Sequence, residues 1–178
     1  MDQLHLRAEG PDDARDVRAV NEAAFGRAAE ADLVDALRAR LGERCVSLVA
    51  ARGTRVIGHI LFSPLRLEPE PAPPADPAEQ RLWALGPMAV EPSQQRWGVG
   101  AALVRAGIDA CRERGGEAVF VLGHATYYPR FGFRRAGPLG FSCVWPVPEE
   151  VFRVLELRPG ALEGRSGQVL YEPEFSAV

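Results

Sequence analysis

A β-strand, a glycine-containing turn, a long helix and a second strand follow one another between residues 82 and 122, and this order restricts the fold most. The helix carries apolar side chains at i, i+4, i+7 and i+11, namely Val99, Leu103, Ala106 and Ala110, so one face of it is buried. The pair Gly115-Gly116 ends this helix. Two strands joined by such a helix pair in parallel within one sheet. The sequence therefore predicts an α/β fold with a parallel strand pair.

The first strand of this unit, residues 82–90, contains a glycine and a proline in its middle. Proline has no backbone N–H, so Pro87 cannot donate a hydrogen bond to a neighbouring strand. A central strand tolerates proline only at a bulge or where a partner strand is missing. We therefore expect one of these two irregularities at Gly86 and Pro87.

The turn before the helix, Gln95-Arg96-Trp97-Gly98-Val99-Gly100, is typical of an anion site. The first amides of a helix lack partners within the helix, and glycine lets a phosphate approach the backbone. A Walker loop is excluded because the chain contains no lysine. A dinucleotide fingerprint needs a third glycine, where this chain has Leu103. A Gln-x-x-Gly-x-Gly phosphate turn remains, and a turn that is merely tight is the alternative.

Composition excludes several classes of protein. The formal net charge is −3, from 21 basic and 24 acidic residues, which argues against a nucleic-acid partner. No apolar run has the roughly 18 residues of a membrane helix, and the first residues do not resemble a signal peptide, so we expect a cytoplasmic protein without a membrane partner. Three cysteines and three histidines lie far apart without metal-ligand spacing, so we expect neither a disulfide framework nor a metal site.

The remaining chain predicts further elements around this unit. A short strand at residues 4–7 precedes a helix that opens at Pro11, and a second helix carries leucines up to residue 41. Two apolar runs, 45–51 and 56–62, form a hairpin around a turn at 52–55. The proline-rich residues 64–77 are predicted to form a stiff solvated loop, with an SH3-type ligand as the alternative.

Two segments closely resemble the signatures of the GNAT superfamily of N-acetyltransferases. Residues 85–103 are similar to its acetyl-CoA-binding motif, and Tyr127-Tyr128-Pro129-Arg130-Phe131-Gly132-Phe133 is similar to its second signature. The strong resemblance covers residues 81–136, and the tail looks like that of an uncharacterised subgroup of predicted N-acetyltransferases. The resemblance to the superfamily implies an α/β fold with a mixed, partly splayed sheet flanked by helices. Residues 1–178 would form a single domain with a core at 4–136 and a C-terminal extension at 137–178.

The resemblance also implies how acetyl-CoA binds as a co-substrate. The backbone of Met88, Ala89 and Val90 would bond the pantetheine arm and the acetyl carbonyl. The turn and the start of the helix would wrap the pyrophosphate, through Gln95, Arg96, Trp97, Gly98, Val99, Gly100 and Ala101.

In the same family a tyrosine gives a proton to the leaving thiolate. Tyr128 aligns with that general acid, and Tyr127 is its alternative. The carboxylate that some members carry on the following strand is absent here, and the frequent asparagine after it is replaced by Gly123-His124-Ala125. His124 is a candidate proton relay near pH 7, and no general base is assigned. Other candidate bases are Glu22, Glu30, Glu91 and ordered water.

The predicted function is therefore transfer of acetyl from acetyl-CoA to a primary amine by direct attack on the thioester. The alternative is a non-catalytic CoA-binding sensor or interaction module. The acceptor would be a small-molecule or peptide amine; an acidic floor built from Glu22, Glu30, Asp32 and Asp35 would indicate a polyamine or an aminoglycoside. A homodimer is an option, in which Phe152, Leu155, Leu157 and a late strand at 169–171 would cover the partner.

Overall fold

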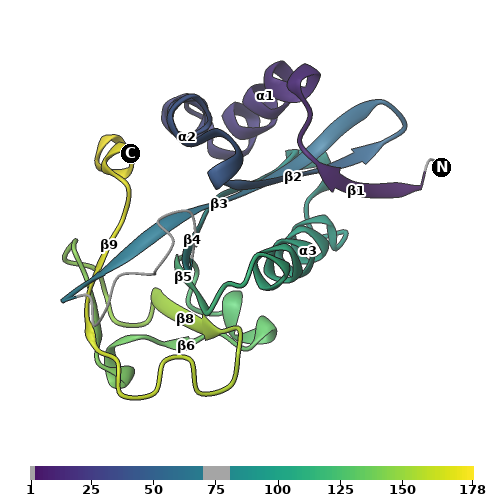
Figure 1. Ribbon diagram of the computed structural model, residues 1–178. Helices are drawn as coiled ribbons and strands as arrows, with labels where there is room; N and C mark the ends of the chain where they lie inside the picture. The colour runs from purple at the N-terminus through teal and green to yellow at the C-terminus, as the bar shows by residue number, and fades with distance from the viewer. Residues whose placement is uncertain (1–2, 70–80) are drawn as a thin grey trace.

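The computed structural model describes residues 3–69 and 81–178 (Figure 1). Its helices are α1 (Ala14–Phe25), α2 (Ala29–Leu41) and α3 (Val99–Glu113). Its strands are β1 (Leu4–Ala8), β2 (Val46–Arg52), β3 (Arg55–Glu68), β4 (Leu82–Val90), β5 (Ala118–Leu122), β6 (Arg134–Arg135), β7 (Phe141–Cys143), β8 (Phe152–Glu156) and β9 (Gly167–Leu170). Short 3₁₀ turns lie between them, including Tyr128–Phe131 after β5 and Pro173–Ala177 after β9.

The strands form a mixed sheet in the order β1-β2-β3-β4-β5-β8-β6, with β9 joining the far end of β3 and β7 joining β9. Along the main order β4 and β5 are parallel, as the strand–helix–strand pattern predicts, and the other neighbours are antiparallel. The predicted α/β fold with a mixed sheet is confirmed.

Helices cover both faces of the sheet (Figure 1). On one face α1 and α2 bury Val17, Val20 and Val34 against the sheet, and on the other α3 buries Leu103 and Val104. Within the described residues, no helix is long and apolar enough to span a bilayer.

Strands β4 and β5 are paired along only half the length of β4. The parallel pairing runs from Leu82 with Ala118 to Leu85 with Val121, and β4 then continues to Val90 without β5 beside it. On its other edge β4 stays paired with β3, across a register shift between Ile60 and Phe62. Both predicted irregularities are therefore present beside Pro87, and the sheet is splayed at this point.

Two sequence-based boundaries need correction. The first helix begins at Ala14, because Pro11–Asp13 form a 3₁₀ turn in front of it. Part of the proline-rich tract is strand instead of loop, since β3 continues through Pro64 to Glu68. Its pairing with β2 ends at Phe62, so Pro64 lies where β3 has an unpaired edge, which tolerates a residue without an N–H. Residues 70–77 of that tract lie outside the described residues.

The C-terminal part of the chain, residues 137–178, adds strands to the sheet. Strand β8 inserts between β5 and β6, and β9 pairs with residues 66–68 of β3. Phe152 and Leu157 are 4% and 7% exposed, and both pack into the chain's own core. Their burial leaves these two side chains little surface for a partner, and the homodimer stays a prediction.

Candidate active site

A cavity of about 1130 Å³ lies where β4 and β5 separate. Residues of α1 and α2 line it from one face of the sheet, and the start of α3 lines it from the other (Figure 1). Residues from the strands and from the turn before α3 that line it are Leu85, Gly86, Pro87, Met88, Val90, Gln95, Arg96, Gly98, Gly100, Ala101 and Leu122. The gap in the sheet is therefore the point at which a ligand on one face can reach a ligand on the other.

The turn before α3 is held in a conformation that presents backbone amides. Arg96 has φ of 64° and Gly98 has φ of 83°, both in the left-handed region. Gln95 fixes the turn, since its Nε2 donates to the carbonyl oxygen of Val90 at 3.0 Å. The first bond of the helix runs from Ala102 N to Gly98 O at 2.9 Å, so the amides before Ala102 have no partner within α3. Free amides at the positive end of a helix bind anions.

The backbone of β4 presents polar groups to the gap at alternate residues. Glu91 donates its N–H to Ile57 O at 2.9 Å, and Ala89 is in register with His59 of β3. Because hydrogen-bonded residues alternate in an antiparallel ladder, Ala89 directs its backbone to β3, whereas Met88 and Val90 direct theirs to the open side. Two of the three predicted pantetheine contacts thus face the gap.

Tyr128 lies after β5 and is almost completely buried, with 6% exposure. Its ring makes edge-type contacts with the rings of Phe133 and Tyr127, at centroid distances of 5.6 Å and 5.2 Å. It also lies against the backbone of Gly123, where a Cβ atom would come within 2.2 Å of Tyr128 Cε2. Burial raises the pKa of Tyr128 far above its usual value, and the neighbouring Tyr127 raises it further. Tyr128 therefore keeps its proton at neutral pH.

Tyr127 is half-buried and reaches across the cavity to the start of α3. A Cβ atom on Gly100 would lie 3.0 Å from the Tyr127 hydroxyl oxygen, so the absence of a side chain there makes room for the phenol. The guanidinium carbon of Arg130 lies 4.7 Å from the centre of the Tyr127 ring. Burial raises the pKa of Tyr127, and Arg130 and Arg105 lower it by a smaller amount. Tyr127, Arg130 and His124 all line the cavity.

Three of the predicted cofactor residues do not line the cavity with their side chains. Ala89 and Val99 are buried, at 1% exposure each, and Val99 packs in the core beneath α3. Trp97 is 77% exposed and lies outside the lining, so its indole does not hold the start of the helix in place. The remaining predicted residues, Met88, Val90, Gln95, Arg96, Gly98, Gly100, Ala101, His124, Tyr127 and Tyr128, share one cavity.

Several lining residues have no local signal in the sequence. They come from α1, α2, the residue before β8 and the C-terminal segment, namely Ala24, Phe25, Leu33, Val151, Tyr171, Phe175 and Val178. Glu30, one of several candidate bases, also lines the cavity. Arg130 stands within the tyrosine-containing signature, and its cationic side chain could have suggested a site for phosphate.

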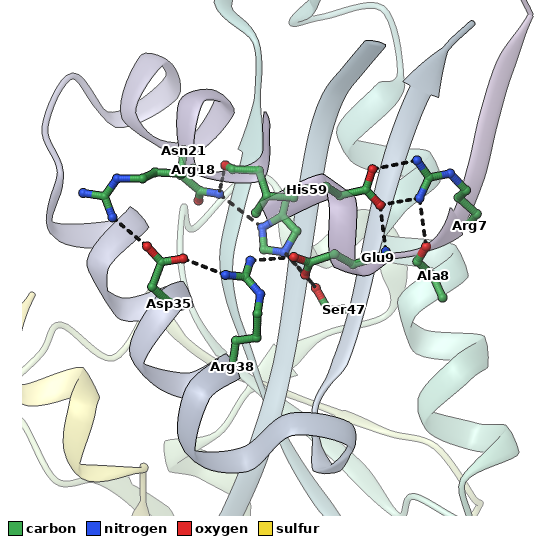
Figure 2. Close-up of polar contacts among 12 residues, drawn as sticks. Arg7, Ala8, Glu9, Arg18, Asn21, Asp35, Arg38, Ser47 and His59 are labelled. Carbon is green, nitrogen blue, oxygen red and sulfur yellow. Dashed lines mark hydrogen bonds and ion pairs between the residues drawn. The ribbon is translucent and has the colours of Figure 1, made fainter. Parts of the chain in front are cut away.

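His59, which is fully buried, takes part in a polar cluster away from the cavity (Figure 2). Its Nδ1 lies 3.2 Å from Asn21 Nδ2, and its Nε2 lies 2.9 Å from Ser47 Oγ and 3.6 Å from Glu9 Oε2. Arg38 donates from Nη2 to Glu9 Oε1 at 2.5 Å. Burial lowers the pKa of His59 despite the opposing effect of Glu9, and hydrogen bonds from His59 and Ser47 lower the pKa of Glu9 despite its burial. This cluster joins α1 and α2 to the sheet.

Among residues 3–69 and 81–178, no group of three or more His, Cys, Asp or Glu side chains could hold a metal ion. The polar groups that line the cavity are backbone amides, the phenols of Tyr127, Tyr128 and Tyr171, the side chains of Gln95, Arg96 and Arg130, His124 and Glu30.

Comparisons with known proteins agree with this geometry. Residues 14–133 match the model of the Acetyltransferase (GNAT) family. The chain is 44% identical to the uncharacterized N-acetyltransferase YjhQ of Escherichia coli K12 over 140 residues, which are 78% of this chain and 74% of that protein. A crystal structure of the N-acetyltransferase YhbS from Escherichia coli with CoA has a TM-score of 0.88 at 32% identity, covering 99% of this chain and 93% of that one. A GNAT acetyltransferase from Brucella melitensis with acetyl-CoA has a TM-score of 0.77 at 32% identity, covering 98% and 99%. The chain belongs to the GNAT family of acetyltransferases.

Proposed function

We propose that the protein transfers the acetyl group of acetyl-CoA to a primary amine, by direct attack of the amine on the thioester. The observation that carries this proposal is the gap between β4 and β5, which a helix start rich in free amides borders on one face. Two relatives of similar structure were crystallised with CoA or acetyl-CoA, which supports the same co-substrate here.

The turn before α3 would bind the pyrophosphate of acetyl-CoA. The amides of Val99, Gly100 and Ala101 would bond the pyrophosphate, aided by the guanidinium groups of Arg96 and Arg130. Each hydrogen bond to a charged group contributes about 1.5–3 kcal/mol, more than the roughly 0.3–1 kcal/mol of the helix dipole at an exposed site. The aimed amides therefore dominate the affinity.

The free edge of β4 would hold the pantetheine arm and the acetyl group. Met88 and Val90 direct backbone groups to the gap, and the Val90 carbonyl already accepts a bond from Gln95. An N–H of this edge, aimed at the thioester carbonyl, would stabilise the oxyanion, a contribution of about 2.7–4 kcal/mol in other enzymes.

The proposed chemistry forms a C–N bond and breaks the C–S bond, while the amine nitrogen loses a proton and the sulfur gains one. Tyr128 would donate its phenolic proton to the departing sulfur, with Tyr127 as the alternative donor. Because burial disfavours a phenolate at position 128, its proton must be replaced as it leaves. The nitrogen of the attacking amine is the natural source, directly or through His124, which lines the same cavity.

Calorimetric titration with acetyl-CoA, with ATP and NADH as controls, tests the cofactor. Micromolar binding of acetyl-CoA alone supports the proposal, and absence of binding contradicts it. Tyr128→Phe and Tyr127→Phe then test the acid by thiol release with an amine. We expect the true donor's variant to lose about 10²–10⁴-fold in kcat with unchanged CoA affinity. Unchanged kcat in both variants would exclude a tyrosine acid and leave solvent as the donor.

A further inference from the structure

The part of the cavity on the α1 and α2 face of the sheet is bordered by large apolar side chains. Phe25 ends α1, Leu33 lies in the first turns of α2, and Tyr171 and Phe175 belong to the C-terminal segment. The Tyr171 and Phe175 rings are 5.2 Å apart between centroids, at 64° to each other. We call these four side chains the apolar wall.

The apolar wall is fixed in place by the packing of the C-terminal segment on α2. Phe175 packs against the cluster formed by Leu33 and the following leucines of α2. Arg40 of α2 forms ion pairs with both Glu172 and Glu174, and its Nη2 lies 2.8 Å from Glu174 Oε2. The aromatic part of the wall is therefore held against α2 by Phe175 itself and by the two glutamates that precede it.

Among residues 3–69 and 81–178, acidic side chains are scarce in the cavity lining. Within the described residues, Glu30 is the one Asp or Glu side chain in the lining, and it is 8% exposed. Its two oxygens both lie 3.1 Å from Nε of Arg27, whose side chain is 61% exposed and does not line the cavity, so Glu30 offers one carboxylate to an ammonium group from the cavity side. The other carboxylates considered for an acidic floor pair with Arg18 and do not line the cavity, namely Glu22, Asp32 and Asp35.

This distribution of charge decides between classes of amine. A polyamine or an aminoglycoside carries several ammonium groups, and each would need a carboxylate once it leaves water. A peptide brings backbone N–H and C=O groups, which also cost free energy when buried without partners. The apolar wall offers a single polar side-chain group, the buried Tyr171 hydroxyl, which has no hydrogen-bond partner among the described residues and could pair with only one such group. An apolar molecule with a single amino group carries neither cost.

We propose that the acceptor is a small monoamine with an apolar or aromatic body. The body lies on the apolar wall, and Glu30 attracts the single ammonium group into the cavity. This inference rests on the proposed acetyl transfer and adds its substrate class.

Acetyl-CoA-dependent thiol release with four amines tests the inference: 2-phenylethylamine, spermidine, kanamycin and a short peptide with a free amino terminus. We expect kcat/KM for 2-phenylethylamine to exceed each of the others by about tenfold or more, the scale of discrimination by an apolar pocket. A preference for spermidine, kanamycin or the peptide would overturn the substrate class while leaving acetyl transfer intact.

Two variants assign the effect to named residues. Phe25→Ala is expected to raise KM for 2-phenylethylamine about tenfold, with little change for ethylamine, which is too short to cover the wall. Phe25 is 41% exposed, so the fold should tolerate its loss, and Leu6→Ala, at 37% exposure outside the cavity, is the matched control. Glu30→Gln should raise KM for both monoamines by about tenfold or more and leave KM for acetyl-CoA unchanged. Unchanged KM values in both variants would refute the inference.

Binding without turnover separates the inference from the proposed function. Saturation-transfer NMR of 2-phenylethylamine, with and without CoA, reports contact of its ring with the protein. A signal that disappears in Phe25→Ala supports the substrate class, even if no acetyl is transferred. In that case only the proposed acetyl transfer is refuted. No signal and no transfer to 2-phenylethylamine, with normal acetyl-CoA binding, would refute the substrate class alone.

Discussion

Replacing Gly123 with alanine tests whether the position of the Tyr128 ring sets the rate of acetyl transfer. The new Cβ atom would lie 2.2 Å from Tyr128 Cε2, 2.9 Å from Cδ2 and 3.1 Å from Cζ. Carbon atoms rest at about 3.5 Å or more, so the ring must move by roughly 1.3 Å. Phe133 and Tyr127 lie against the ring and limit the directions open to it. A displacement of about 1 Å can cost about 10²-fold in rate.

We therefore expect Gly123→Ala to lower kcat about a hundredfold, measured as thiol release at saturating acetyl-CoA and amine. Calorimetry should give an unchanged affinity for CoA, because Gly123 follows β5 and is not part of the turn before α3 that is proposed to bind the pyrophosphate. Overpacking of this kind costs about 1–3 kcal/mol of stability, so the assay is run well below the measured Tm of the variant.

The double variant Gly123→Ala/Tyr128→Phe shows whether the effect passes through the tyrosine. If the alanine acts by misplacing the phenol, it adds little once the hydroxyl is gone, and the two effects are strongly non-additive. A kcat near that of the unchanged protein in Gly123→Ala, or fully additive losses in the double variant, would refute the reasoning.

Three further outcomes are expected. Gly98→Val should weaken CoA binding by roughly tenfold or more in calorimetry, because a β-branched residue at φ of 83° costs about 1–3 kcal/mol and distorts the turn; normal binding of CoA would place the phosphate elsewhere. The rate should rise with pH as the amine loses its proton. It should not fall near pH 10, the usual pKa of tyrosine, because burial raises the pKa of Tyr128. A fall near pH 10 that disappears in Tyr128→Phe would contradict this expectation. The free energy of unfolding should decrease as pH drops from 7 to 5, because His59 takes up a proton near pH 6.5 in the unfolded chain whereas its pKa is lowered in the folded protein. Urea titrations at several pH values, on the protein and on His59→Gln, check this. The same dependence of the unfolding free energy on pH in both proteins would contradict it.

The elements around the turn could be predicted because their signals are local. The spacing from Val99 to Ala110 reports a buried helix face, and Gly98 and Gly115 mark positions near its ends at which φ is positive. Pro87 predicted a bulge or a missing partner strand, and β4 has both at this point. In each case a few neighbouring residues carry the physical cause.

The other half of the cavity could not be predicted because its cause is not local. Phe25 and Phe175 are 150 residues apart, and they share a cavity because β9 pairs with an extension of β3 that the sequence suggested was a loop. Nothing within residues 171–177 indicates that Arg40 will bind the two glutamates there. Pairings over such separations depend on the whole topology.

The gap between β4 and β5 has a consequence for how this kind of protein can diversify. The turn at 95–101 lies on one face of the sheet, and the residues of α1, α2 and the C-terminal segment lie on the other. Substitutions on the two faces share few direct contacts, so their effects on binding should be close to additive. A duplicated gene could then change the amine that its product binds by single substitutions at Phe25, Leu33 or Phe175. The proposed acetyl-CoA site on the other face would keep its residues at each step.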